Sequence, residues 1–180
     1  MPNVAGQAYA LSVFTPILPG HADELRQHLE QLGSGAQSPL AALHATHFAR
    51  WVIIDDLVYE GAPQERDKLR SQYLLFESCL DGDSGAYLEA MRTAMAAEAD
   101  AIWGHCVGYP GSGAAAAFAA YMRHNQLEAS FFVAAYPNAT VEDVRHSLAL
   151  RARIIELAIA TQDVDAVTAL AAYRRMVGGP

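Results

Sequence analysis

The pattern of apolar and polar positions predicts short strands that alternate with amphipathic helices. AYALSVF, from Ala8 to Phe14, is typical of a strand, and the TPILPG that follows breaks it. Leu25, Leu29 and Leu32 then recur at helical spacing. Acidic residues open this segment and Gly33 follows it, as is common at the two ends of a helix. The chain therefore opens with a strand and a helix.

The same pattern predicts four more elements before residue 112. THFARWVIID is rich in β-branched and aromatic residues and predicts a second strand, and Tyr73 to Phe76 predict a third, antiparallel to it. Ser84 is a candidate N-cap for a helix that reaches about Ala99. DAIWGHC predicts a fourth strand, closed by the turn VGYPG. The order βαββαβ predicts an α+β, ferredoxin-like fold, an antiparallel sheet with helices on one face.

The last third of the chain continues this plan. AAAAFAAYMRHNQ predicts a helix, and EASFFVAAY predicts a strand that joins the same sheet or that of a second copy. TVEDVRHSLALRARIIELA predicts a long helix with Thr140 as its N-cap, and Asp163 to Met176 predict a final helix. With 180 residues, 52% of them hydrophobic, we expect one domain. Residues 8–111 would form its ferredoxin-like core, and residues 112–180 would pack on that core as an extension.

Composition and charge narrow the range of partners and compartments. The formal net charge is −8 and the arginines are scattered, which argues against nucleic acid and anionic membranes as partners. No window approaches the roughly 18 apolar residues of a membrane span, and the N-terminus lacks the pattern of a signal peptide. We therefore expect a cytoplasmic protein. Cys79 and Cys106 lie in apolar segments, where buried, reduced thiols are the common finding.

The βαββαβ order, with its PG turn ahead of an amphipathic helix, resembles the dimeric α+β barrel group over Ala8 to about Gly111. That group includes antibiotic-biosynthesis monooxygenase-like proteins, chlorite dismutases and dye-decolourising peroxidases. THFARWVIID, LLFESCLDGD, DAIWGHCVGYPG and AAYPNATVEDV are similar to a bacterial family sometimes linked to peroxidase-like or lipoxygenase-like modules. If the protein is an enzyme, the first resemblance implies redox chemistry on an aromatic or lipid-like substrate, whereas the second does not point to any particular activity.

A homodimer is expected on physical grounds as well. A sheet with helices on one face needs cover on the other, and a second copy can supply it. The alternative is that the C-terminal helices cover that face within one chain, which would give a monomer.

Alternation along the second strand separates its candidate side chains. His47, Ala49, Trp51 and Ile53 would share one face, and Thr46, Phe48, Arg50 and Val52 the other. The same rule places Trp103 and His105 on one face of the fourth strand. If the two faces coincide, both tryptophans and both histidines would line a concavity suited to an apolar ligand or to an acid–base step. The alternative is that the tryptophans fill the core, while the histidines bind carbonyl groups or lie at a rim.

Candidate site residues follow from this arrangement. Tyr109 and Tyr136 each precede a proline and could close the mouth of such a pocket or simply anchor a turn. Arg50, within an apolar strand, needs a carboxylate, a carbonyl group or an anionic ligand as its partner, and a salt bridge to an acidic residue such as Asp55 or Glu77 is favoured. The candidate catalytic residues are His47, Arg50 and His105, and the candidate ligand-binding residues are Trp51, Trp103, Tyr109 and Tyr136.

The sequence does not predict a metal site, but haem is a candidate cofactor. His44 and His47 are three residues apart, a spacing that aligns ligands on a helix but not on a strand, so no metal site is predicted. Haem is a candidate cofactor by fold analogy, since one axial histidine suffices. His105 is the first choice for that ligand, with His124 and His146 as alternatives on helices.

Together these features predict a protein that binds a small apolar or aromatic ligand between its sheet and its helices. Whether it is an enzyme stays open, and redox chemistry is the preferred class if it is one. The alternative is a non-catalytic accessory or interaction domain for a peroxidase-like or oxygenase partner.

Overall fold

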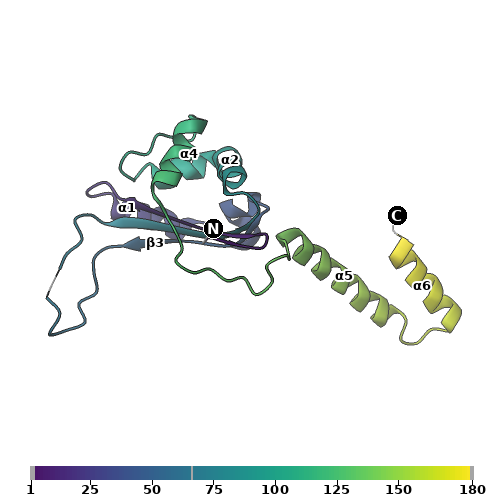
Figure 1. The fold of residues 1–180 in the computed structure, drawn as a ribbon. Coiled ribbons are helices and arrows are strands. Elements are labelled where there is room, and N and C mark those ends of the chain that lie inside the picture. The colour runs from purple at the N-terminus through teal and green to yellow at the C-terminus, as the bar shows by residue number, and fades with distance from the viewer. Residues whose placement is uncertain (1–2, 66, 179–180) are drawn as a thin grey trace. The chain divides into compact units, whose positions relative to one another are not determined.

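The computed structural model describes residues 3–65 and 67–178 and shows an α+β fold (Figure 1). The chain divides into two compact units, Met1–Thr140 and Val141–Pro180. The first unit contains the sheet and extends beyond residue 111 to include residues 112–140. That residues 141–180 pack on the core to form one domain with it stays a prediction.

The first unit is built on an antiparallel sheet of five strands. Its three long strands are β2 (Ala8–Pro16), β3 (Thr46–Ile54) and β4 (Tyr73–Asp81). The path of the sheet is β1-β2-β4-β3, where β1 is Val4–Ala5, and β5 (Gln126–Leu127) also pairs with β2. The predicted antiparallel pairing of the second and third long strands is confirmed.

Helices cover one face of this sheet (Figure 1). Alternate residues of β2 and β4 are buried, among them Val13 and Phe76, and they belong to one core cluster with Met91 and Phe118 from the helices. The intervening residues point to the other face, which we call the open face. The helices of the first unit are α1 (Ala22–Gln31), α2 (Ser84–Ala94), α3 (Ala96–Trp103) and α4 (Ala115–His124), with short 3₁₀ turns η1 (Gly35–Gln37) and η2 (Pro39–Ala42).

The predicted fourth strand, DAIWGHC, is wrong: its first four residues lie in α3. Ala99, Ile102 and Trp103 recur at helical spacing and are all buried, so helical burial outweighs the apparent alternation. After the helix, Cys106 forms a single β-bridge with Ile17. The outer edge of β2 is thus occupied by three short pieces of chain, namely β1, β5 and this bridge.

The predicted strand EASFFVAAY is also wrong, because residues 128–136 form no regular structure. At the middle of β2 the available edge is taken by β5, where Gln126 and Leu127 lie opposite Val13 and Ser12. The segment is instead tied down at both ends. Asn3 accepts a hydrogen bond from the Ala129 N–H, and the Gln7 N–H donates to the Pro137 carbonyl.

Two smaller details differ from expectation. Asp83, rather than Ser84, is the N-cap of α2, and its carboxylate accepts a hydrogen bond from the Ala86 N–H. A register irregularity between Thr46 and Phe48 leaves His47 outside the paired positions of β3. Such a bulge shifts the alternation by one residue. The Thr46 hydroxyl consequently meets Tyr87 of α2 on the helical face, opposite to the predicted side.

The second unit consists of two helices, α5 (Val141–Ala160) and α6 (Ala166–Gly178), and both were expected from the sequence. The Arg153 guanidinium of α5 donates to the Met176 carbonyl of α6, so the two helices contact each other. Many of their apolar side chains, such as Ile159 and Val167, are exposed. Among the residues described, none of the helices combines the length and the apolar character needed to cross a membrane.

Candidate functional site

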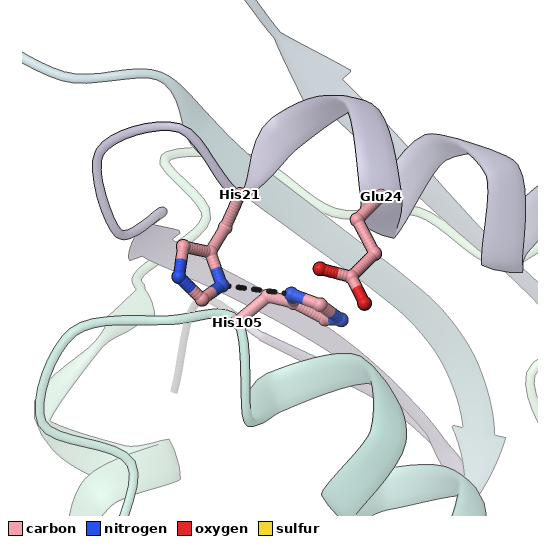
Figure 2. Close-up of side chains that lie close together, drawn as sticks. All are labelled: His21, Glu24 and His105. Carbon is pink, nitrogen blue, oxygen red and sulfur yellow. Dashed lines mark hydrogen bonds between the residues drawn. The ribbon is translucent and has the colours of Figure 1, made fainter.

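His21, Glu24 and His105 gather beside the start of α1 (Figure 2). Nδ1 of His21 lies 3.1 Å from Nδ1 of His105. One ligand atom from each of the three side chains lies within 4.8 Å of the others. Both histidines are half-buried and Glu24 is exposed, so the cluster is open to solvent. Two imidazoles and one carboxylate thus face a common point at the surface of the first unit.

The local fold explains the placing of the first two side chains. The PG turn positions His21, whose N–H donates to the Leu18 carbonyl, and Gly20 adopts a φ of +84° that favours glycine. His21 occupies the N-cap position of α1, where its side chain makes no capping hydrogen bond, and Glu24 lies in the first turn. A spacing of three places both side chains on the same side of a helix.

His105 is carried to this point by backbone hydrogen bonds with the end of β2. The Leu18 N–H donates to the His105 carbonyl at 2.8 Å, and the Val107 N–H donates to the Pro16 carbonyl at 2.8 Å. The residue before His105 is Gly104, where a Cβ atom would lie only 2.4 Å from the Asp100 carbonyl oxygen. The two segments that supply the cluster are therefore joined directly to each other.

His105 was a sequence candidate, whereas His21 and Glu24 were missed. The H-x-x-E spacing at the predicted start of a helix could have drawn attention to that pair. The third member could not be found in this way, because it depends on the Ile17–Cys106 bridge between distant segments.

Haem does not fit the three histidines named for it. Nδ1 of His105 faces His21, and Figure 2 shows its other ring nitrogen on the side of Glu24. A haem axial ligand needs one free nitrogen that faces an enclosed apolar slot. His124 and His146 are exposed on α4 and α5, without such an enclosure.

The proposed concavity of two tryptophans and two histidines is not what these residues form. Trp51 and Trp103 do meet, with ring centroids 6.3 Å apart, and both pack on Phe76. Trp103 is 0% exposed, so this aromatic group belongs to the core. Nε2 of His47 lies 2.6 Å from Oδ1 of Asp81, while His105 pairs with His21.

The remaining candidates lie at three separate places. Nε of Arg50 donates to Oε2 of Glu77 at 2.6 Å, which confirms one of its two expected partners. The Tyr109 hydroxyl donates to Oδ1 of Asp100 at 2.8 Å, and burial together with this carboxylate raises the pKa of Tyr109. Tyr136 is exposed in the irregular segment.

A groove runs along the open face of the sheet. It has a volume of about 390 Å³, and two phenylalanines of the irregular segment form one of its walls. Burial, with a smaller contribution from Glu77, raises the pKa of the Cys79 thiol in the groove. The lining residues are Ala10, Leu11, Ser12, Phe48, Ala49, Arg50, Glu77, Ser78, Cys79, Ala129, Phe131 and Phe132.

Comparisons of this chain with protein-family models, with curated proteins and with solved structures gave no match.

Proposed function

We propose that the first unit binds a small, largely apolar ligand in the groove on the open face of its sheet. The observation that carries this proposal is the aromatic wall of the groove. Phe48 is 77% exposed and Phe131 is 83% exposed, and both line it together with Phe132. Its volume falls within the range of about 300–1,000 Å³ that is common for small-molecule sites.

This location replaces the space between sheet and helices that the sequence favoured, because Trp51, Phe76 and Trp103 fill that space. The groove also contains a charged group of each sign, Arg50 and Glu77. A guanidinium carries five N–H donors, so Arg50 can bind the carboxylate of a ligand while it remains paired with Glu77. The ligand class that fits is a fatty acid or an aromatic acid, with an apolar body and one anionic end.

Cys79 provides a test, because a ligand in the groove would cover its thiol. We expect the rate of Cys79 alkylation by N-ethylmaleimide to fall as dodecanoate or an aromatic acid is added, followed by mass spectrometry of the full chain. Phe48→Ala should weaken this protection by about tenfold or more, since a large buried aromatic contact is lost. The matched control is Val58→Ala, an exposed apolar residue outside the groove, which should leave it unchanged.

An alkylation rate that stays the same at millimolar ligand would contradict this proposal. So would equal protection in the wild type and in Phe48→Ala. Either result would favour the alternative of an accessory domain whose open face contacts a peroxidase-like or oxygenase partner.

We propose in addition that the first unit pairs with a second copy through its open face. The support is that Phe48 and Val52 of β3 are exposed on this face, which a second sheet could cover. Sedimentation velocity should show a dimer for the wild type and a monomer for Val52→Glu, because a buried unpaired charge opposes the contact and Val52 does not line the groove. A monomeric wild type would refute this pairing without affecting the ligand proposal.

We also propose that the protein is cytoplasmic. Both cysteines are free thiols, in keeping with a reducing cytoplasm. Redox chemistry on the bound acid is the reaction class that we propose if the protein is an enzyme, on the likeness to the dimeric α+β barrel group.

A further inference from the structure

We propose that His21, Glu24 and His105 bind a divalent first-row transition metal ion of the zinc and iron(II) class. The inference is independent of the groove, because none of the three residues lines it. Two imidazole nitrogens and one carboxylate suit these metals, whereas magnesium and calcium prefer sites made of oxygen atoms.

The separation of the two histidines agrees with a shared metal. Zinc–nitrogen bonds of about 2.0–2.1 Å place two nitrogens of a tetrahedral or octahedral centre about 2.8–3.4 Å apart. The observed distance between the two Nδ1 atoms is 3.1 Å. The two nitrogens therefore already have the separation that binding to one shared ion requires.

Glu24 needs only a small movement to complete the set. Two atoms bound to one ion lie at most about 4.2 Å apart, twice a metal–ligand bond. The three ligand atoms already lie within 4.8 Å of one another. Glu24 is exposed and on the first turn of α1, so a change of rotamer can close the difference.

Two other histidines of the first unit each lie close to one potential ligand, in contrast to the three side chains of this cluster. Nε2 of His28 lies 3.0 Å from Oε1 of Glu98, and His47 pairs with Asp81. Each is a histidine with one carboxylate. In the described part of the chain, residues 3–65 and 67–178, the group at His21 is the one that brings three potential ligands together.

The scaffold favours binding through its rigidity, although one electrostatic effect opposes it. Backbone hydrogen bonds join the segment that contains His21 to the segment that contains His105, so binding of the ion costs little conformational entropy. The positive end of the α1 dipole disfavours a cation there. Glu24 offsets this effect with its own negative charge, and Asp23 in the same turn adds a second, although Arg26 pairs with it.

Three protein ligands leave at least one coordination position open. In proteins this arrangement is typical of metal ions that bind water or a small exchangeable anion, since structural zinc sites use four protein ligands. The half-exposed position of the cluster gives such a ligand access from solvent.

The test is a metal titration of the full chain with any affinity tag removed. We expect Co²⁺ to give visible d–d absorption bands that saturate at one ion per chain, and Zn²⁺ to compete with it in isothermal titration calorimetry. His21→Ala and His105→Ala should each weaken binding by more than about 100-fold, because changes to residues outside the ligand set already cost about 10–100-fold. Glu24→Gln, a conservative change at an exposed position, should weaken binding while leaving the fold intact.

The matched controls are His28→Ala and His47→Ala, which each remove a histidine paired with a carboxylate and should leave binding unchanged. Far-UV circular dichroism of every variant establishes that it is folded. The proposal is overturned if the wild type does not bind Co²⁺ or Zn²⁺ at micromolar concentrations. It is also overturned if Glu24→Gln and a folded His105→Ala variant bind as tightly as the wild type.

Discussion

The buried hydroxyls around Tyr87 show how single residues fix the contact between sheet and helix. The Tyr87 hydroxyl lies 3.0 Å from Oγ1 of Thr46 and 2.9 Å from Oγ of Ser78. Ser78 is 3% exposed, so water cannot readily replace this partner. One phenol thus joins α2 to both β3 and β4.

Replacing Tyr87 with phenylalanine should lower the free energy of unfolding by about 1–3 kcal/mol, because a buried hydroxyl then loses its partner. Urea denaturation monitored by circular dichroism measures this difference. The double variant Tyr87→Phe/Ser78→Ala should recover part of the loss, since both polar groups are removed together. A double variant that is less stable by the full sum of the single effects would argue against this pairing.

The two thiols should differ in reactivity. Burial raises the pKa of Cys106 to about 11, although a hydrogen bond from Thr15 opposes the shift. At pH 8 only about one Cys106 in a thousand is then the reactive thiolate. We expect native protein to be alkylated at Cys79 and not at Cys106, and both to react in denaturant. Peptide mass spectrometry distinguishes them, and rapid native labelling of Cys106 would contradict the expectation.

Asp100 links stability to pH. Burial alone would raise its pKa, but hydrogen bonds from Ser112 and Tyr109 outweigh burial and lower the pKa. A carboxyl group whose pKa is lowered by folding stabilises the fold at pH values above its pKa in the unfolded state. This contribution is lost as the pH falls through its pKa in the folded state. Asp100→Asn should therefore be less stable than the wild type at pH 7, with a difference that shrinks below about pH 4. A difference independent of pH, in urea midpoints, would exclude this linkage.

At the scale of elements, the apolar pattern correctly predicted the strands and helices whose apolar residues recur at a regular spacing along one face. The long strands β2, β3 and β4 and the helices α1, α4, α5 and α6 all lie where the periodicity placed them. The strand prediction for DAIWGHC was wrong because so short a segment fits both the strand and the helix period. The helix is the form that buries Ile102 and Trp103. FFVAAY failed because strand propensity does not show which sheet edge is free.

Gly104 marks the end of α3 and offers a test at this scale. A Cβ atom there would lie 2.4 Å from the Asp100 carbonyl oxygen, so Gly104→Ala must shift backbone. We expect a loss of about 1–3 kcal/mol in the free energy of unfolding, as is common when a packed site is overfilled. Gly113→Ala is the matched control, because a Cβ there meets no atom within 4 Å. Equal unfolding midpoints for the two variants would show that the backbone at Gly104 adapts freely.

The candidate metal cluster was beyond sequence reasoning for a related reason. The helix supplies His21 and Glu24 by local geometry, but His105 arrives through a bridge between residues 17 and 106. Pairings of this kind depend on tertiary structure, which no local pattern encodes. The groove was missed for the same reason, since Phe131 and Phe132 were expected in a strand.

At the scale of the whole molecule, the hydrophobic core belongs to the first unit. The buried core cluster contains residues from Leu11 to Met122, and none from residues 141–178, the described part of the second unit. A chain truncated after Thr140 should therefore keep a cooperative urea transition and the near-ultraviolet dichroism of its tryptophans. Loss of that dichroism on truncation would show that the first unit depends on residues 141–180.

The second unit should behave differently in isolation. Two helices with so many exposed apolar side chains bury too little surface to be stable as a separate monomer. A peptide of residues 141–180 should be largely unfolded when dilute and gain helix content as its concentration rises. Circular dichroism over a concentration series checks this, and full helicity in dilute solution would refute it.

The divided outer edge of β2 also has a consequence for synthesis on the ribosome. β1 and β2 emerge early, but the bridge at Cys106 and the pairing of β5 with β2 need chain that is made much later. Until then, most of that edge has free N–H and C=O groups, which can pair with other nascent chains. The period before residue 127 leaves the exit tunnel is therefore when this protein has most need of a chaperone.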